Sequence, residues 1–333
     1  MSTHYFRFTH RGAGDRQRAW LLERLLARAD APFVVTDWRA DAYRIIAPKA
    51  HTMPGLGAAA LCAELGSVDA ASVFIATPVH YLAEMSNVRL AAEGLLSLSP
   101  TEAQALAADF NRVWHDAGIR LIAGRPPAAA GMGPTHLFCV SDRALHAETR
   151  DPEDVLDRHI AEYLPVGADA PRLRQLMSEI EMWLFEHAVN RTRVLRAAPP
   201  ISGFWLWGGG PALASLPPLE GWTAGTDVFF NAFDAPPTAS SEAHTAGVVR
   251  TNVGLSAGSR AAPASGVVVI DAEPGSQAWR DAESRWLERS LGDLNSGRIS
   301  RLDLSAGGRC FSVKGRWNRR PWRRRKPWWE VFL

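Results

Sequence analysis

Hydrophobic side chains recur along this chain with two different periods, and segments of the two kinds alternate. Large apolar residues at helical spacing over residues 15–29, 171–188 and 276–294 predict amphipathic helices. Short apolar runs at 72–76 and 266–271 predict buried strands instead. Alternation of strand and helix is typical of an α/β protein. We therefore expect a three-layer sandwich around a mainly parallel sheet.

Shorter patterns add further elements to this outline. Ser99, Pro100 and Glu102 predict a capped helix start, and Gly118 is expected to end that helix. Pro78 is expected to end the strand that begins at residue 72. Residues 235–265, poor in large apolar side chains, are expected to form a surface loop or linker. Helices are also expected at 58–65 and 151–163, and strands at 33–36, 43–46, 119–123, 136–140, 227–233, 299–304 and 309–313.

The order of these elements predicts one α/β domain over residues 1–313, with a sub-domain around 77–200. A length of 333 residues suits either one large domain or two smaller ones. Residues 314–333 differ in composition and form a basic, tryptophan-rich C-terminal tail. No internal repeat is visible.

Composition and cysteine usage narrow the class of protein. The chain is 47% hydrophobic and 22% charged, as expected for a globular protein with a sizeable core. Cys62, Cys139 and Cys310 are far apart and form no CxxC pair, which argues against a disulfide framework and against a cysteine-rich zinc site. The N-terminus has no apolar leader-like run, and no segment is long and apolar enough to span a bilayer. We expect a cytoplasmic protein without a transmembrane segment.

The net charge of +2 is the sum of a strongly basic tail and an acidic body. The tail holds eight basic residues and one acid. Arginine alternating with tryptophan suits nucleic acid, where arginine meets phosphate and tryptophan stacks on bases. The same pattern suits an anionic membrane surface. It also suits a tail that folds back on the acidic body and buries its tryptophans. These alternatives stay open, as does a protein partner, for the interaction residues Arg316, Arg319, Arg320, Trp322, Arg323, Arg324, Arg325, Lys326, Trp328 and Trp329.

Polar residues crowd between residues 183 and 210. His187, Asn190 and Arg193 follow one another at intervals of three, so on a helix they share a face. A guanidinium flanked by neutral hydrogen-bonding groups can hold a phosphate or carboxylate. The alternative, which we favour, is that His187 and Asn190 cap a helix C-terminus while Arg193 pairs with an acid.

An aromatic strand with Trp205 and Trp207 follows and ends in three glycines. The glycines could cradle phosphate, but close approach of neighbouring backbone is the commoner reason for glycine at a strand end. His80 comes after another strand, a position where functional side chains gather in α/β folds. The anion-binding candidates are thus His80, His187, Asn190, Arg193, Trp205, Trp207, Gly208, Gly209 and Gly210.

Other catalytic patterns are missing from the sequence. It has no GxxxxGK[ST] loop, no GxSxG elbow and no HExxH motif. Asp271 ends a strand, but Glu273 is its nearest acidic neighbour, and a metal site needs three or four ligands. We expect no metal site and no cofactor, and we assign no catalytic residue.

In order and spacing, several of these pieces resemble the RpfE-type regulatory protein family of proteobacteria. The similarity spans most of the chain and is strongest between residues 72 and 210. The matching pieces are Pro78-Val79-His80, Ser99-Pro100-Thr101-Glu102-Ala103 with Asn111, Leu164-Pro165-x-Gly167-x-Asp169, Glu179 with Met182, His187-x-Val189-Asn190-x-x-Arg193, and Trp205-x-Trp207-Gly208-Gly209-Gly210.

That family is in turn distantly similar to archaeal-type cofactor-independent phosphoglycerate mutases. This similarity implies a degenerate alkaline-phosphatase-like fold and, in the enzymes, phosphoryl transfer through two divalent metals and a serine nucleophile. The chain departs from the enzymes where that chemistry lies. Residues 5–14 lack the Asp-Gly metal motif, and His244 is the last histidine, so a late His/Asp cluster is missing. Thr77 and Ala188 stand where the group usually has Asp and Pro.

The sequence therefore leaves three hypotheses. The first is a non-catalytic regulatory or scaffold protein with a relict phosphate or anion pocket and an interaction tail. The second is a metal-dependent phosphoryl-transfer enzyme similar to phosphoglycerate mutase. The third is a nucleic-acid-binding module that acts through the tail.

Overall fold

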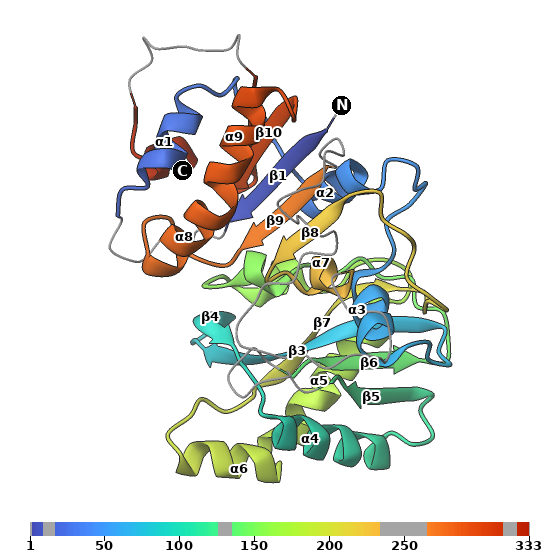
Figure 1. Cartoon of the computed structure of the whole chain (residues 1–333). Coiled ribbons are helices and arrows are strands. Elements are labelled where there is room, and N and C mark those ends of the chain that lie inside the picture. Colours follow the sequence, from blue (N-terminus) through green and yellow to red (C-terminus); the bar gives the residue numbers. More distant parts are fainter. Residues whose placement is uncertain (1, 9–16, 126–134, 234–264, 316–324, 333) are drawn as a thin grey trace. The chain divides into compact units, whose positions relative to one another are not determined.

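The computed structural model describes residues 2–8, 17–125, 135–233, 265–315 and 325–332. The chain divides into two compact units (Figure 1). The first unit combines Met1–Met53 with Pro217–Leu333, and the second is the continuous segment Pro54–Leu216. Each unit has its own sheet, and the range 77–200 expected as a sub-domain lies inside the second unit.

The first unit is built on a six-stranded sheet in the order β2-β11-β10-β1-β9-β8. Its four adjacent strands β10, β1, β9 and β8 are parallel, whereas β11 and β2 pair antiparallel at one edge. The predicted mainly parallel sheet is therefore confirmed here. Its strands are β1 (Thr3–Phe8), β2 (Phe33–Val34), β8 (Trp222–Gly225), β9 (Gly266–Ile270), β10 (Arg301–Ala306) and β11 (Arg309–Lys314).

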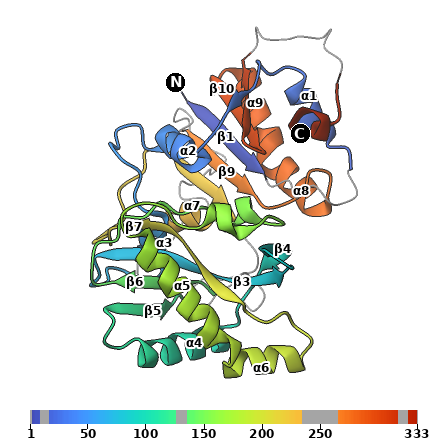
Figure 2. The same ribbon diagram turned by 180° about the vertical axis from the view of Figure 1, so that it is seen from behind.

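Helices cover both faces of this sheet, as the two opposite views show (Figures 1 and 2). Phe6 and Phe8 of β1 point into a core formed with one set of helices. On the other face Arg7 lies over the ring of Trp38, with its Cζ 5.3 Å from the ring centroid. This is the predicted three-layer α/β sandwich. One layer holds α1 (Trp20–Leu26), α8 (Gln277–Ala282), a π-helical turn (Glu283–Leu287), α9 (Glu288–Ser296) and α10 (Trp328–Phe332), and the other holds α2 (Trp38–Ile46) and α7 (Val228–Ala232).

The second unit contains an antiparallel sheet in the order β4-β3-β6-β5, and β7 pairs with β3 as well. β3 is long enough to pair with three strands, and this places β3 at the centre of the unit. The strands are β3 (Ser72–Ala83), β4 (Val88–Leu95), β5 (Ile119–Ala123), β6 (Leu137–Ser141) and β7 (Gly203–Gly210). The helices are α3 (Leu56–Leu65), α4 (Pro100–Val113), α5 (Ala170–Phe185) and α6 (Ala188–Leu195).

Two predicted strands are helices instead. The range 43–46 belongs to α2, which begins where the Asp37 side chain accepts a hydrogen bond from the backbone N–H of Ala40. The range 227–233 belongs to α7, where Asp227 accepts from two successive backbone N–H groups. An aspartate ahead of an aromatic run is a helix-capping signal, and here it outweighs the strand propensity of the aromatic residues.

Other boundaries also differ from the prediction. β3 continues through Pro78, because proline lacks only its N–H and the Pro78 carbonyl still accepts from Leu96 at 2.9 Å. The range 151–163 forms two 3-10 turns, Pro152–Val155 and Ile160–Tyr163, separated by Asp157 with a φ of 59°. The helix start at Ser99 is confirmed by a complete capping box, but this helix ends at Val113, ahead of Gly118.

The described end of the tail folds into the first unit. The Trp328 side chain is 0% exposed, and its Nε1 donates to the Gln17 carbonyl at 2.9 Å. Phe332 packs edge-on against Phe8 with a centroid separation of 5.0 Å. Arg325 and Lys326 are exposed. Burial of tryptophan, one of the three alternatives for the tail, is therefore correct for Trp328, whereas residues 316–324 lie outside the described residues.

Almost all of the expected loop at 235–265 also lies outside the described residues. Within the part of the chain that is described, no helix has the length and apolar character needed to cross a membrane.

Candidate functional site

The second unit brings the family-like segments together on paired strands. β3 and β7 run antiparallel, with Thr77 opposite Trp205 and Pro78 opposite Phe204. His80 therefore lies on β3 near the start of β7. The four residues that lead into β7, Pro199 to Ser202, run beside this pair and are called the strap below.

Three of the polar candidates hydrogen-bond to the backbone of the strap. His80 Nδ1 lies 2.9 Å from the Pro200 carbonyl oxygen. Asn190 donates to the Ile201 carbonyl and accepts from the Ile201 N–H, both at 2.8 Å. Arg193 Nε donates to the Pro199 carbonyl at 2.9 Å. The structure thus brings His80, Asn190 and Arg193 together, and it does so around a segment of the protein itself.

Arg193 has a second set of partners at the start of α4 and in the residues just before it. Its guanidinium pairs with Glu102 at 2.9 Å and reaches the Ser97 carbonyl at 3.4 Å. Glu102 is also the acid of the capping box with Ser99. Burial raises the pKa of Glu102, but hydrogen bonds from Ser99 and the charge of Arg193 outweigh burial, and the net pKa is lowered. The prediction that Arg193 pairs with an acid is confirmed.

His187 caps the start of α6, a helix that the sequence analysis missed. Its Nδ1 accepts from the Val189 N–H at 3.1 Å, and its Nε2 lies 3.2 Å from Asp109 Oδ2. Burial lowers the pKa of His187 and outweighs the opposite effect of Asp109. Asn190 does cap the preceding helix, since it donates to the Leu184 carbonyl at 2.8 Å. The expected C-terminal cap is therefore correct for Asn190 and wrong for His187.

The glycines of β7 allow close packing against neighbouring chain. A Cβ on Gly209 would lie 2.2 Å from the Phe74 ring, and one on Gly210 would lie 2.7 Å from the Gly55 Cα. Gly208 has a φ of 64°, a conformation that L side chains rarely adopt. The indole N–H groups of this strand bind within the unit, Trp205 to the Arg150 carbonyl and Trp207 to the Thr77 hydroxyl, both at 2.8 Å.

The side chains that sequence offers as metal ligands are spread over the two units. Asp271 follows β9 in the first unit, and His80 and His187 belong to the second. The acceptor nitrogen of His187 is engaged by the backbone of α6. Among the residues that the structure describes, no three His, Cys, Asp or Glu side chains are grouped closely enough to hold a metal ion.

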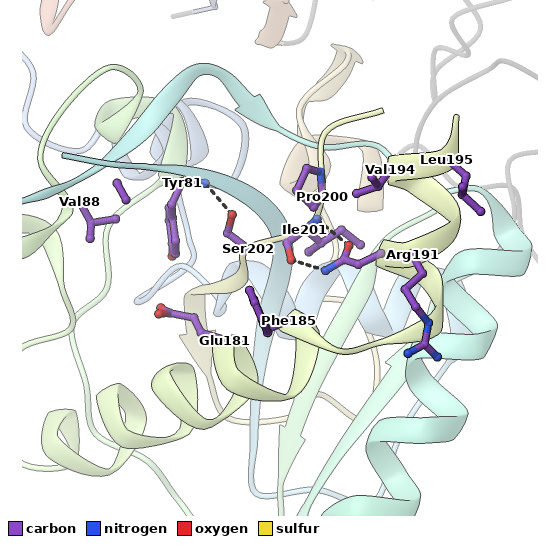
Figure 3. A pocket seen from close by; sticks show the side chains of 12 residues that line it. Tyr81, Val88, Glu181, Phe185, Arg191, Val194, Leu195, Pro200, Ile201 and Ser202 are labelled. Atoms are coloured by element: carbon purple, nitrogen blue, oxygen red, sulfur yellow. Dashed lines mark hydrogen bonds between the residues drawn. The ribbon is translucent and has the colours of Figure 1, made fainter. Parts of the chain in front are cut away.

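An apolar groove of about 800 Å³ lies against the strap, and the sequence analysis did not find it. β3, the start of β4, the end of α5 and one side of α6 contribute to its walls (Figure 3). A signal was present, because Phe185, Val194 and Leu195 break the polar pattern at the helix ends and are all exposed. The lining residues are Tyr81, Ala83, Val88, Glu181, Phe185, Asn190, Arg191, Val194, Leu195, Pro200, Ile201 and Ser202.

Comparison with known proteins points to one enzyme class, over part of the chain. The chain is 43% identical over 61 residues to the 2,3-bisphosphoglycerate-independent phosphoglycerate mutase of Methanothrix thermoacetophila, covering 18% of this chain and 16% of that protein. It is 33% identical over 88 residues to a probable enzyme of the same name from Geobacter sulfurreducens, covering 26% and 22%. The chain is distantly similar to phosphoglycerate mutases. The matched part spans less than a quarter of either relative.

Two solved structures align along most of the chain at low similarity. The cofactor-independent phosphoglycerate mutase from Thermoplasma acidophilum aligns with a TM-score of 0.33 and 12% identity, covering 94% of this chain and 89% of that one. The PH0037 protein from Pyrococcus horikoshii aligns with a TM-score of 0.44 and 11% identity, covering 94% and 87%. No family model matches the chain.

Proposed function

We propose that this protein is a non-catalytic binding protein, regulatory or scaffolding, on a frame distantly related to phosphoglycerate mutase. The resemblance to RpfE-type regulatory proteins agrees with such a role. One observation carries the proposal. His80, Asn190 and Arg193 hydrogen-bond to the backbone of the strap, and the strap forms a wall of the apolar groove. The residues that sequence marks for anion binding therefore build a surface for an apolar partner.

Energetics support this assignment over an anion pocket. Two of the three guanidinium nitrogens of Arg193 are engaged, Nε by the Pro199 carbonyl and Nη1 by Glu102, so a phosphate that used them would have to displace these partners. Each buried polar group left without its partner costs about 1–3 kcal/mol. Asn190 is likewise committed at both ends of its amide. Replacing these contacts would also release the strap, and with it one wall of the groove.

Metal-dependent turnover tests the proposal. The purified protein, incubated with Mn²⁺, Zn²⁺, Co²⁺ or Mg²⁺ in turn, should neither interconvert 3-phosphoglycerate and 2-phosphoglycerate nor hydrolyse p-nitrophenyl phosphate above the metal-only rate. A metal-stimulated rate above the metal-only control would overturn the proposal, and its loss in His187→Ala would place His187 in the reaction. His187→Asn is the matched variant, since asparagine is also a good helix N-cap and keeps α6 capped.

The second candidate is a phosphoryl-transfer enzyme with a metal ligand set of its own. The specific observation in its favour is the 43% identity over 61 residues to a phosphoglycerate mutase. This candidate requires tight metal retention, so elemental analysis of protein purified without chelator separates the two. About two equivalents of a transition metal per chain would favour the enzyme.

The proposal includes a cytoplasmic location for the protein and an electrostatic role for its C-terminal tail. Cys62, Cys139 and Cys310 are free thiols, in keeping with a cytoplasmic protein. The exposed Arg325 and Lys326 support an electrostatic role for the basic part of the tail, but the buried Trp328 has no free face on which a base could stack. A nucleic-acid role would show strongly salt-dependent binding that is lost when Arg319, Arg320, Arg323 and Arg324 are replaced by glutamine.

A further inference from the structure

The groove beside the strap contains polar groups that the fold itself does not use. The Tyr81 hydroxyl is buried and has no hydrogen-bond partner among the described residues. Glu181, half-buried on the groove-facing side of α5, is likewise without an ion pair or hydrogen bond in the described part of the chain. Burial raises the pKa of both side chains, and for Tyr81 the nearby Glu181 charge raises it further. A buried hydroxyl without a partner is costly, and a ligand that donates or accepts there would remove that cost.

The opposite end of the groove is apolar and unusually exposed. Phe185 is 84% exposed and Leu195 is 88% exposed, although both are large hydrophobic side chains. Figure 3 shows Tyr81 and Glu181 at one end and Val194 and Leu195 at the other, with Phe185 between them. Hydrophobic side chains that line a cavity and extend beyond its rim are typical of a surface that binds another protein.

We propose that the groove binds an amphipathic segment of a partner protein that presents apolar side chains to Phe185 and Leu195 and a lysine or arginine to Glu181. Charge complementarity selects this occupant. At the Tyr81 end, the unpaired Glu181 carboxylate favours a cation and opposes an anionic group, while Arg191, the other charged residue of the lining, directs its guanidinium away from the strap (Figure 3). The exposed rim favours a segment longer than a small molecule, because a small ligand would leave Phe185 and Leu195 in water. This inference rests on the proposed binding function.

Selection from a library of random peptides displayed on phage tests the inference with the full-length protein as bait. Peptides are selected on the wild type and counter-selected on the double variant Phe185→Ser/Leu195→Ser. Because both side chains are mostly in water, these substitutions should leave the fold intact, and urea unfolding checks this. The enriched peptides should combine leucine, methionine or aromatic residues at helical spacing with at least one lysine or arginine.

Synthetic versions of the enriched peptides then test the role of Glu181. Glu181→Gln should weaken the lysine-containing peptide about fivefold to tenfold, as expected for a partly buried charge pair. The same substitution should change the affinity of a matched peptide with norleucine in place of lysine by less than about twofold. Selection on Glu181→Lys should enrich peptides that carry aspartate or glutamate instead. Val113→Ser is the matched control for the Phe185→Ser/Leu195→Ser variant and should leave peptide binding unchanged. Val113 is 55% exposed in the same unit and does not line the groove.

Several results would overturn the inference. These are a library that yields no binder sensitive to the Phe185→Ser/Leu195→Ser variant, or enriched peptides without a bias to lysine and arginine. Self-association abolished by the same variant would identify a second copy as the occupant, and groove-dependent binding to phosphatidylserine vesicles would identify a membrane. Failure of the peptides without metal-dependent turnover removes this inference alone, whereas metal-dependent turnover removes the proposed function whatever the peptides do.

Discussion

Asn190 and Ile201 hold each other through two hydrogen bonds, both 2.8 Å long: the Asn190 amide donates to the Ile201 carbonyl and its oxygen accepts the Ile201 N–H. The same amide nitrogen donates to the Leu184 carbonyl at 2.8 Å. One side chain therefore joins the end of α5, the start of α6 and the strap. A residue that looks like a ligand-binding asparagine in sequence acts here as an internal connector.

Replacing Asn190 by alanine should lower the free energy of unfolding by about 3 kcal/mol, because the buried backbone groups of Ile201 lose their partner. Urea unfolding followed by tryptophan fluorescence measures this. Thr192→Ala is the control on the same helix, since Thr192 is exposed, and it should change stability by less than about 0.5 kcal/mol. An Asn190→Ala protein as stable as the wild type would show that the connection contributes nothing.

The stability of the protein should depend on the protonation of His187. Its pKa is lowered by burial from the ordinary 6.5, so the unfolded chain binds a proton more readily than the folded one. The contribution is fully present above about pH 6.5 and is lost as the pH falls through the folded-state pKa. His187→Asn keeps an N-cap acceptor for Val189 without a titrating group, so its unfolding free energy should depend less on pH between about 5 and 6.5 than that of the wild type. Identical pH profiles would contradict this assignment.

Substitutions at the glycines of β7 distinguish a packing role for these residues from a role in binding phosphate. Gly209→Ala should destabilise the protein by about 1–3 kcal/mol, since the new methyl group would lie 2.2 Å from the buried Phe74 ring. Adding Phe74→Leu should recover part of this loss. Gly292→Ala is the contrasting case, because nothing lies within 4 Å of a Cβ there and alanine favours the helix by about 1 kcal/mol. Destabilisation that Phe74→Leu does not relieve would argue against the packing explanation.

The C-terminal helix α10 should be part of the stable core. Trp328→Ala should cost about 3–5 kcal/mol, because the side chain is fully buried and its indole N–H is hydrogen-bonded to Gln17. Replacement of the exposed Arg325 and Lys326 by glutamine should change stability little. Thermal unfolding compares these variants, and a Trp328→Ala protein with wild-type stability would show that α10 is not required for the fold.

Sequence predicts the elements whose signals are local. The capping box at Ser99 and Glu102 and the buried run of β9 are both found as expected. Prediction fails where distant contacts decide. The sheet of the second unit joins strands from residue 72 to residue 210, and no local pattern encodes their pairing. The helix α7 is a different case, because the cap at Asp227 is a local signal that outweighs the strand propensity of the aromatic run.

The candidate site shows the same limit. Spacing places His187, Asn190 and Arg193 close together, and they are close, but their partners lie at residues 109, 201 and 102. These partners determine whether a polar side chain is free to bind a ligand, and sequence alone does not reveal them. The groove depends on the same distant contacts, since the strap that walls it is held in place by His80, Asn190 and Arg193.

The central claim is that these polar side chains build the groove and do not bind an anion. Side-chain NMR of the protein during a titration with 3-phosphoglycerate tests it most directly. The titration is run with and without Zn²⁺, which is diamagnetic and therefore stands in for Mn²⁺. The account predicts no saturable shift of the His80 and His187 ring signals or of the Asn190 and Arg193 side-chain N–H signals. Saturable shifts of these signals, with the Glu102 and strap contacts broken, would contradict it.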